Sequence, residues 1–161
     1  MDKLKENSDI DFMKEALKEA EKAALEGEVP VGAVIVYENE IISKGRNRRE
    51  ISKNALLHAE MEAIYKACEK LGRWRLTDCT LYVTLEPCPM CTGAIINSRI
   101  SKLVYGASDP KAGSCESVIN LFELPYNHFP EVLGGVLKDE CSEILSSFFK
   151  NLREKKSKKE N

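Results

Sequence analysis

Apolar residues recur along the chain with two different spacings, and each spacing predicts a type of secondary structure. A repeat of three to four residues is typical of an amphipathic helix. Helices are accordingly expected at 10–25, 56–71, 89–98, 118–122 and 139–153. Short runs rich in valine and isoleucine, bounded by polar residues or glycine, are typical of strands. Strands are accordingly expected at 29–37, 41–43, 80–85, 102–105 and 131–137, and the first two are expected to form a β-hairpin.

This alternation of strands and helices predicts an α/β fold with a mostly parallel sheet covered by helices. A chain of 161 residues is long enough for one domain with a continuous core. We expect a single domain over 1–154 and a basic, frayed tail over 155–161. The segment 108–130 carries several turn-forming residues, so it is expected to be a long loop of the kind that is often functional.

Composition excludes several classes of protein. Charged residues make up 31% of the chain and hydrophobic residues 43%, a mixture typical of globular domains and not of disordered chains. The first residues lack the apolar segment of a secretory signal, and no stretch is long enough to cross a bilayer, so we expect a cytoplasmic protein that does not contact membranes. A net charge of -2 excludes the broad positive field of a general nucleic-acid binder. Any contact with nucleic acid must therefore be local.

Two motifs contain the side chains that bind zinc in enzymes. The stretch 87–91 reads PCPMC, so two thiols lie three positions apart where a strand ends and a helix begins, and both can face one point. The stretch 58–60 reads HAE and supplies an imidazole. A catalytic zinc site takes three protein ligands and leaves the fourth position for water. We therefore predict that His58, Cys88 and Cys91 hold one Zn²⁺.

Glu60 supplies the proton transfers that such a site needs. Zinc lowers the pKa of bound water toward about 7, and hydrolytic removal of an amino group still requires a group that moves a proton to the ring and to the departing ammonia. Glu60 and His58 are two residues apart, so they can reach one cavity only at the first turn of their helix. H-x-E together with P-C-x-x-C is the signature of zinc-dependent nucleobase deaminases. Glu60 is thus the predicted catalytic residue.

The alternative is a zinc site that only stabilises the fold. Such a site normally closes with a fourth protein ligand. The remaining candidates, none at ligand spacing from the two motifs, are Cys68, Cys79, Cys115, Cys141 and His128. The catalytic interpretation is therefore favoured, and the four cysteines are expected to pack in apolar surroundings. A core position is also expected, from helical spacing, for Met61, Ile64 and Tyr65.

The chain resembles the bacterial tRNA-specific adenosine deaminase family over nearly its whole length. The similar segments are 30–34 (PVGAV), 45–47 (GRN), 74–76 (WRL), 81–88 (LYVTLEPC), 93–94 (GA), 98–100 (SRI), 109–113 (DPKAG) and 148–149 (FF). The resemblance implies a three-layer α/β/α cytidine deaminase-like fold with a central mixed five-stranded sheet, a homodimer, and one Zn²⁺ per subunit. It also implies a zinc-dependent hydrolase that converts the wobble adenosine of a tRNA anticodon stem-loop to inosine and releases ammonia.

A deaminase of a free nucleobase or nucleoside in salvage, such as cytosine, cytidine or guanine, is the alternative function. Such an enzyme can use the same zinc ligands and the same glutamate, so the zinc motif alone does not separate the two. The long final helix, the stretch 109–111 (DPK) in a loop and the basic residues that precede His58 favour RNA, because a small-metabolite enzyme would not need them.

The resemblance further implies which residues contact the substrate. Asn47 would hydrogen-bond the flipped base, and Val31 would pack against it. Asp109 would contact the ribose next to the target, with Lys111 and Phe149 nearby on the anticodon side. Asparagine and aspartate are also common turn residues, so a purely structural role stays open for Asn47 and Asp109.

Two positions depart from the pattern of the family. The stretch 54–57 reads NALL where the family usually has Asp-Pro-Thr-Ala, and Leu57 is expected beside the pocket. Glu116 precedes Ser117 where the family commonly has glycine, and it is expected to add negative charge near RNA. Both departures leave the zinc chemistry unchanged and bear on substrate choice.

Overall fold

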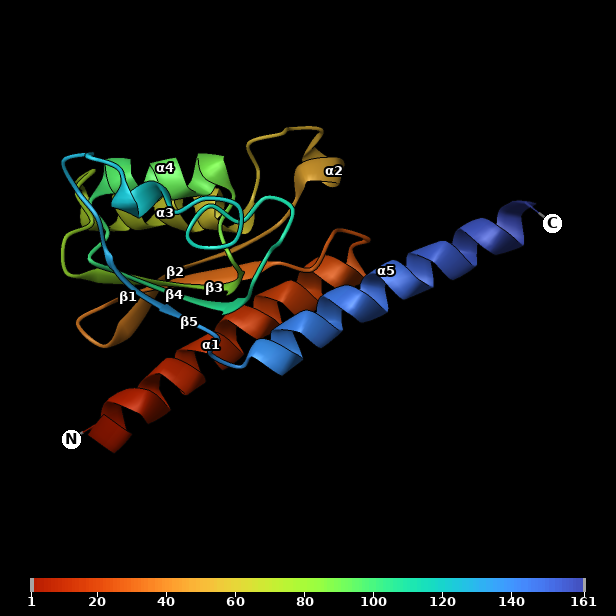
Figure 1. Ribbon diagram of the computed structural model, residues 1–161, viewed down its shortest axis with the longest axis horizontal. Helices are drawn as coiled ribbons and strands as arrows, with labels where there is room; N and C mark the ends of the chain where they lie inside the picture. The colour runs from red at the N-terminus through yellow and green to blue at the C-terminus, as the bar shows by residue number, and fades with distance from the viewer. Residues whose placement is uncertain (1, 161) are drawn as a thin grey trace.

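The computed structural model describes the backbone of residues 2–160 and the side chains of residues 8–159 (Figure 1). Its centre is a five-stranded sheet in the order β2-β1-β3-β4-β5. The strands are β1 (Gly32–Tyr37), β2 (Glu40–Arg46), β3 (Cys79–Leu85), β4 (Lys102–Ala107) and β5 (Glu131–Gly134). The sheet is mixed, because β1 is antiparallel to β2 and β3, whereas β4 is parallel to β3 and β5.

The mixed five-stranded sheet that the resemblance implies is confirmed. The mostly parallel sheet expected from the alternation of strands and helices is wrong for β1 and β2, because β1 is antiparallel to both of its neighbours. The reason lies in the connections. Glu38 and Asn39 both have positive φ angles, 50° and 63°, and form the two-residue loop typical of a tight hairpin, which makes β1 and β2 antiparallel. A helix instead crosses over between β3 and β4, which allows those strands to be parallel.

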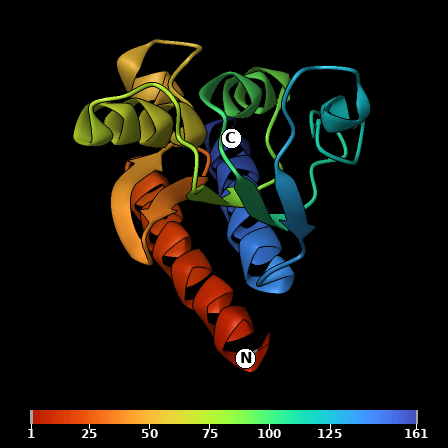
Figure 2. The same cartoon turned by 90° about the vertical axis from the view of Figure 1, so that its left-hand side faces the viewer.

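Helices cover both faces of the sheet and complete the three-layer α/β/α arrangement that was expected (Figures 1 and 2). One layer contains α1 (Asp2–Leu25) and α5 (Lys138–Glu160). The other contains α3 (Ala59–Leu71) and α4 (Pro89–Ser98). The connecting segments hold the short helix α2 (Arg49–Ser52), which the sequence analysis did not predict, and the 3-10 helix η1 (Leu121–Glu123). Of the helices described, none is long and apolar enough to cross a membrane.

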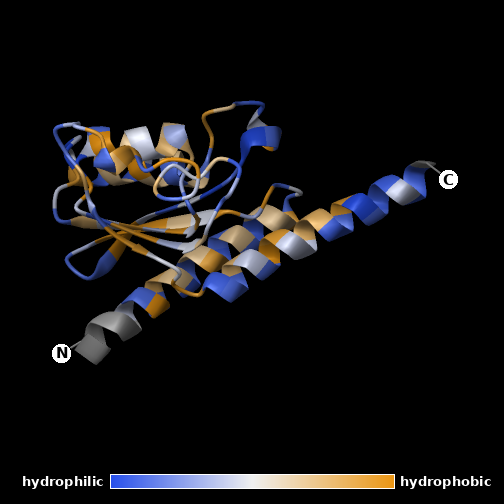
Figure 3. Ribbon diagram, in the orientation of Figure 1, coloured by the Kyte–Doolittle hydropathy of each residue, from blue (hydrophilic) through white to orange (hydrophobic). Residues whose placement is uncertain are grey.

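The sheet separates two apolar cores, and β1 contributes to both because its side chains alternate between the two faces. Ala33 and Ile35 point into the core beneath α3 and α4, whereas Val34 and Val36 point into the core beneath α1 and α5. The strands accordingly appear predominantly apolar in Figure 3. This packing fixes α3 and α4 on one face of the sheet, with their N-termini near the ends of β2 and β3.

Two expectations about helical residues are wrong. The last helix was expected to end near 153, but α5 continues to Glu160 because residues 154–160 contain lysine, glutamate and serine and no glycine or proline. Its end projects beyond the rest of the molecule and is hydrophilic (Figures 1 and 3). Asn161 lies outside the described residues. Tyr65 is not in the core but 68% exposed on α3, whereas Cys79, Cys115 and Cys141 are buried as expected.

Candidate active site

The N-terminus of α3 places His58 and Glu60 at one cavity. His58 precedes the helix in an extended conformation, with φ of -83° and ψ of 158°, and Glu60 lies in the first turn. The break in helical geometry at His58 is what allows two side chains that are two residues apart to face the same space. Both line the same pocket, as the sequence analysis required, and Glu60 is only 4% exposed.

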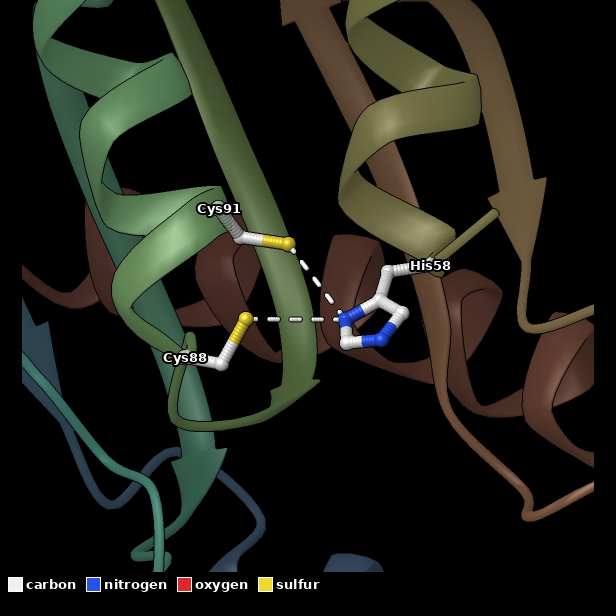
Figure 4. A group of neighbouring side chains, drawn as sticks. All are labelled: His58, Cys88 and Cys91. Carbon is white, nitrogen blue, oxygen red and sulfur yellow. Dashed lines mark hydrogen bonds between the residues drawn. The ribbon is translucent and has the colours of Figure 1, made fainter. Parts of the chain in front are cut away.

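The N-terminus of α4 brings the two thiols to the same place. Cys88 lies just before the helix, Pro89 begins it, and Cys91 lies in the first turn. Proline suits this position because the first helical N–H has no partner within the helix. Figure 4 shows both sulfurs pointing at His58, with Sγ of Cys88 and Sγ of Cys91 each 3.6 Å from its Nδ1. The two helix N-termini also favour negative charge on the thiols.

The spacing of these atoms fits a metal ion. A tetrahedral zinc with bonds of about 2.0–2.1 Å to nitrogen and about 2.3 Å to sulfur separates the two ligand atoms by about 3.6 Å. Nδ1 of His58 has this separation from each of the two sulfurs, and the ligand atoms of all three residues lie within 4.8 Å of one another. Among the described residues, no fourth ligand joins the cluster. His128, one earlier candidate, instead contacts the carbonyl oxygen of Ile100 at 2.8 Å through Nε2.

The protonation of the site also suits a cation. A hydrogen bond from Cys91 lowers the pKa of the Cys88 thiol to about 4, although burial opposes this shift. The same hydrogen bond, together with burial, raises the pKa of Cys91. These directions favour a thiolate at Cys88 beside a protonated Cys91, and a bound metal ion would displace the remaining proton. Hydrogen bonding to Cys88 raises the pKa of His58, and burial raises the pKa of Glu60 to about 7.

A pocket of about 210 Å³ opens over the cluster. Of the residues predicted to contact substrate, Val31 and Asn47 line one wall and Asp109 lines another. Lys111 and Phe149 do not line this pocket. They lie together at a separate hollow of about 350 Å³, which they share with Ser146 and Arg153.

Asn47 and Asp109 both hold turns, as the structural alternative predicted, and both also reach the pocket. Asn47 donates from Nδ2 to the carbonyl of Val29 at 3.2 Å and accepts at Oδ1 from the N–H of Arg49 at 3.2 Å. Oδ1 of Asp109 accepts from the N–H of Lys111 at 3.0 Å. These turns therefore place the side chains of Asn47 and Asp109 at the pocket, where both can also contact a ligand.

Two buried glutamates that the sequence analysis did not single out support the pocket walls. Glu28 is fully buried and accepts hydrogen bonds from the backbone N–H groups of Glu50 and Ile51, at 3.0 and 3.2 Å, beside the Asn47 wall. Glu86 is 2% exposed and accepts from backbone N–H groups of the loop that carries Asp109. The sequence signal that could have found these two residues is an acidic residue next to an apolar run or to a ligand motif. Such a carboxylate is buried only if several hydrogen-bond donors surround it.

The two departures from the family pattern lie outside the pocket lining. Leu57 contributes to an apolar groove along α3 rather than to the pocket wall. Glu116 is exposed, but its carboxylate accepts a hydrogen bond from the buried hydroxyl of Tyr105. Glu116 therefore ties its loop to β4 instead of pointing into the pocket.

Comparisons with known proteins decide the family. A model of the MafB19-like deaminases matches residues 7–153. The tRNA-specific adenosine deaminase of Bacillus subtilis (strain 168) is 54% identical over 146 residues, which is 90% of this chain and 91% of the relative. The chain belongs to the tRNA-specific adenosine deaminase family. This confirms that the protein is a deaminase, as the two motifs predicted.

Solved structures agree with this assignment. The deaminase is similar to a structure from a study of A-to-I editing by tRNA:A34 deaminases at the wobble position of transfer RNA, with a TM-score of 0.81 and 46% identity over 83% of this chain and 98% of that chain. A structure from work on guanine deaminase of Nitrosomonas europaea is similar at a TM-score of 0.74 and 25% identity, over 85% of this chain and 82% of that chain. The cytidine deaminase-like fold is thereby confirmed.

Proposed function

We propose that this protein hydrolyses the wobble adenosine of a tRNA anticodon to inosine and releases ammonia. The observation that carries the proposal is the small pocket lined by His58, Cys88 and the buried Glu60, next to the cluster that His58 and Cys88 form with Cys91. The substrate is supported by relatives named tRNA-specific adenosine deaminase that align with about 90% of the chain.

In this proposal His58, Cys88 and Cys91 hold one Zn²⁺ per subunit. One imidazole and two thiols are soft or borderline donors that suit zinc, and three protein ligands are the number that a catalytic site uses. When bound, zinc supplies a water whose pKa is lowered toward about 7, so that the attacking oxygen is available at neutral pH.

Glu60 moves the protons of the reaction. Its carboxylate takes a proton from the attacking water and delivers it to the ring nitrogen N1 as oxygen adds to C6. It then transfers the second proton to the amino group, which leaves as ammonia when the C6–N bond breaks, so adenosine and water give inosine and ammonia. Burial raises the pKa of Glu60 to about 7, which suits a group that must both accept and donate a proton.

The pocket suits a base rather than a whole nucleotide. Its volume of about 210 Å³ is below the roughly 300–1,000 Å³ of sites for drug-sized ligands. A base in an RNA loop must therefore leave its stack to enter. We assign the contacts to this base to Asn47, whose Oδ1 keeps a second lone pair, and to Val31, and we assign the adjoining ribose to Asp109.

The nucleotides beside the target are assigned to the hollow at α5. Phe149 is 41% exposed there and offers a ring face to an unstacked base, while Lys111 and Arg153 offer positive charge to phosphate. Lys111 and Arg153 form a local basic patch. A protein with a net charge of -2 needs such a patch to bind RNA, because its overall field is not positive.

The homodimer belongs to the same proposal. An apolar groove of about 840 Å³ runs along α3, and the exposed residues at its edge include Leu56 at 56% and Tyr65 at 68% exposure. A second copy of the chain would cover this groove in a two-fold contact. Sedimentation equilibrium tests this assignment, since Tyr65→Glu should shift the protein to monomer if the groove is the interface.

The function is tested with zinc-loaded protein and two kinds of substrate. One is an anticodon stem-loop with adenosine at the wobble position, and the others are free adenosine, cytidine, cytosine and guanine, all scored by mass spectrometry. Inosine in the stem-loop with the free compounds unchanged is the expected result. Turnover of a free base, with the stem-loop unchanged, would replace the RNA substrate by a salvage substrate and leave the site chemistry in place.

A further inference from the structure

We infer that Glu86 is a positioning residue for the reaction, because its buried carboxylate holds the loop 109–117 as one wall of the pocket. The inference rests on the proposed function, since it assigns to Glu86 a role in presenting Asp109 to the substrate. Glu86 follows β3 directly and precedes the PCPMC motif by one position. It is 2% exposed and lines the same pocket as the metal-binding cluster.

The carboxylate of Glu86 is surrounded by donors from the loop. Oε1 accepts from the backbone N–H of Asp109 at 3.0 Å. Oε2 accepts from three consecutive backbone N–H groups, those of Cys115, Glu116 and Ser117, at 3.2, 2.9 and 2.9 Å. The hydroxyl of Ser117 also donates to Oε1. These five donors use the acceptor capacity of the carboxylate, which has about four lone-pair sites, and among the described residues no lysine or arginine forms an ion pair with it.

Other contacts also help to fix the shape of the loop, among them the hydrogen bond from the Tyr105 hydroxyl to the carboxylate of Glu116. Its first residues form a turn on the side chain of Asp109, and one backbone bond joins Ser114 to the carbonyl of Pro87 at 2.9 Å. Gly113 shows how tightly the loop wraps the glutamate, because a Cβ there would lie 2.3 Å from Cδ of Glu86 and 2.5 Å from the carbonyl oxygen of Asp109. Glu86 nevertheless binds both ends of the loop, through Asp109 at one end and through Cys115, Glu116 and Ser117 at the other.

The position of Asp109 follows from this arrangement. Its backbone N–H binds Glu86, and its side chain lines the pocket together with Ala112. Without the carboxylate, four backbone N–H groups would lose their shared acceptor, and buried backbone donors are rarely left unpaired. The loop would then rearrange, and Asp109 would move away from the substrate while His58, Cys88 and Cys91 keep their own supports at α3 and α4.

The variant Glu86→Gln tests this role, because it keeps the size of the side chain and turns one acceptor into a donor. Asp9→Asn is the matched control. Asp9 is also a buried acid, 8% exposed, and it accepts from the Tyr82 hydroxyl at 2.6 Å, but it lies on α1, which covers the opposite face of the sheet. We expect Glu86→Gln to lower kcat/KM for the stem-loop at least tenfold, with zinc content unchanged, whereas Asp9→Asn stays within about twofold of wild type.

A double-mutant cycle separates positioning from general stability. If Glu86 acts through Asp109, then Glu86→Gln and Asp109→Ala are not additive, and the double variant loses little more than either single variant. Losses in kcat/KM that multiply would overturn the inference. So would an activity of Glu86→Gln that matches that of Asp9→Asn at equal loss of stability.

Hydrogen exchange of the intact protein gives a readout that needs no substrate. The amides of Cys115 and Ser117 should exchange faster in Glu86→Gln than in wild type, and unchanged exchange would refute the inference even if the RNA substrate proves wrong. Should Glu86→Gln fail to fold, Ser117→Ala removes only the hydroxyl donor to the carboxylate. This milder variant should speed exchange at the same amides and lower kcat/KM two- to threefold, and no change in either would count against the role of Glu86.

Discussion

The contact between β2 and α3 makes Gly45→Ala a direct test of how the site is positioned. A Cβ at Gly45 would lie 2.2 Å from the carbonyl oxygen of Ala59 and 2.8 Å from the backbone nitrogen of Ala63. Both atoms belong to the backbone of α3, so no side-chain rotation can relieve the contact. Since nonbonded heavy atoms approach to somewhat over 3 Å, the helix must shift by about 1 Å before the methyl group fits.

The shift would act on the catalytic residues directly. Gly45 contacts α3 at its first residue, Ala59, which lies between His58 and Glu60. Displacement of this end moves the imidazole and the carboxylate away from Cys88 and Cys91, which are fixed on α4. Overpacking of this kind costs about 1–3 kcal/mol of stability, and misplacement of reacting groups by about 1 Å can lower turnover about 10²-fold. We expect both effects in Gly45→Ala.

The control is Gly93→Ala, which adds the same methyl group to α4, where among the described residues no atom beyond the adjoining backbone of the helix lies within 4 Å of the new Cβ. Replacing a helical glycine should stabilise the protein by about 0.5–1 kcal/mol and leave turnover unchanged. Urea unfolding measures stability, and initial rates on the stem-loop, expressed per folded molecule, measure turnover. A Gly45→Ala protein as active as Gly93→Ala would refute the claim that this contact positions the site.

Three further predictions use other parts of the molecule. Glu60→Gln should keep the metal, measured by elemental analysis, and lose at least 10²-fold in turnover because the proton relay is removed; wild-type rates would exclude the mechanism. The hydrogen bond from Arg46, at 2.6 Å, lowers the pKa of Glu26 below its usual value of 4.5. The stabilising effect of this ion pair is therefore present above pH 4.5 and is lost as the pH falls through the lowered pKa of Glu26. The difference in unfolding free energy between wild type and Glu26→Gln should shrink in that pH range, and a constant difference would argue against the ion pair. Truncation after Asn151 removes the basic end of α5 and should reduce the salt dependence of stem-loop binding, whereas an unchanged slope would show that this end does not contact RNA.

The convergence of the two motifs could be predicted because each depends on local structure. Proline followed by an apolar stretch begins α4 at Pro89, and this local rule fixes the directions of Cys88 and Cys91. The HAE motif required a first helical turn, and α3 indeed begins at Ala59. Pairing the two motifs then needed only the chemistry of a three-ligand zinc site.

Tyr65 shows where periodicity stops being informative. It was placed in the core because it continues the apolar spacing of Met61 and Ile64, yet α3 carries apolar residues over more than the stripe that the sheet can cover. The fully buried apolar residues of this helix are the alanines Ala59, Ala63 and Ala67, which let the helix approach the sheet closely. The large apolar residues of α3 therefore do not identify the face that packs on the sheet, because a helix that lies close to a sheet needs small residues at the contact.

The walls of the pocket could not be predicted in the same way, because their supports come from distant and irregular segments. The donors to Glu86 lie 23 to 31 positions away in a loop without a repeating pattern. The physical requirement was nevertheless present in the sequence, since an acid next to the apolar strand 80–85 must either reach solvent or collect several hydrogen bonds. Glu28 obeys the same rule on the opposite wall, where the N–H groups of Glu50 and Ile51 supply the donors. An acidic residue that borders a ligand motif or a substrate-side segment is therefore better interpreted as the anchor of a neighbouring loop than as an exposed charge.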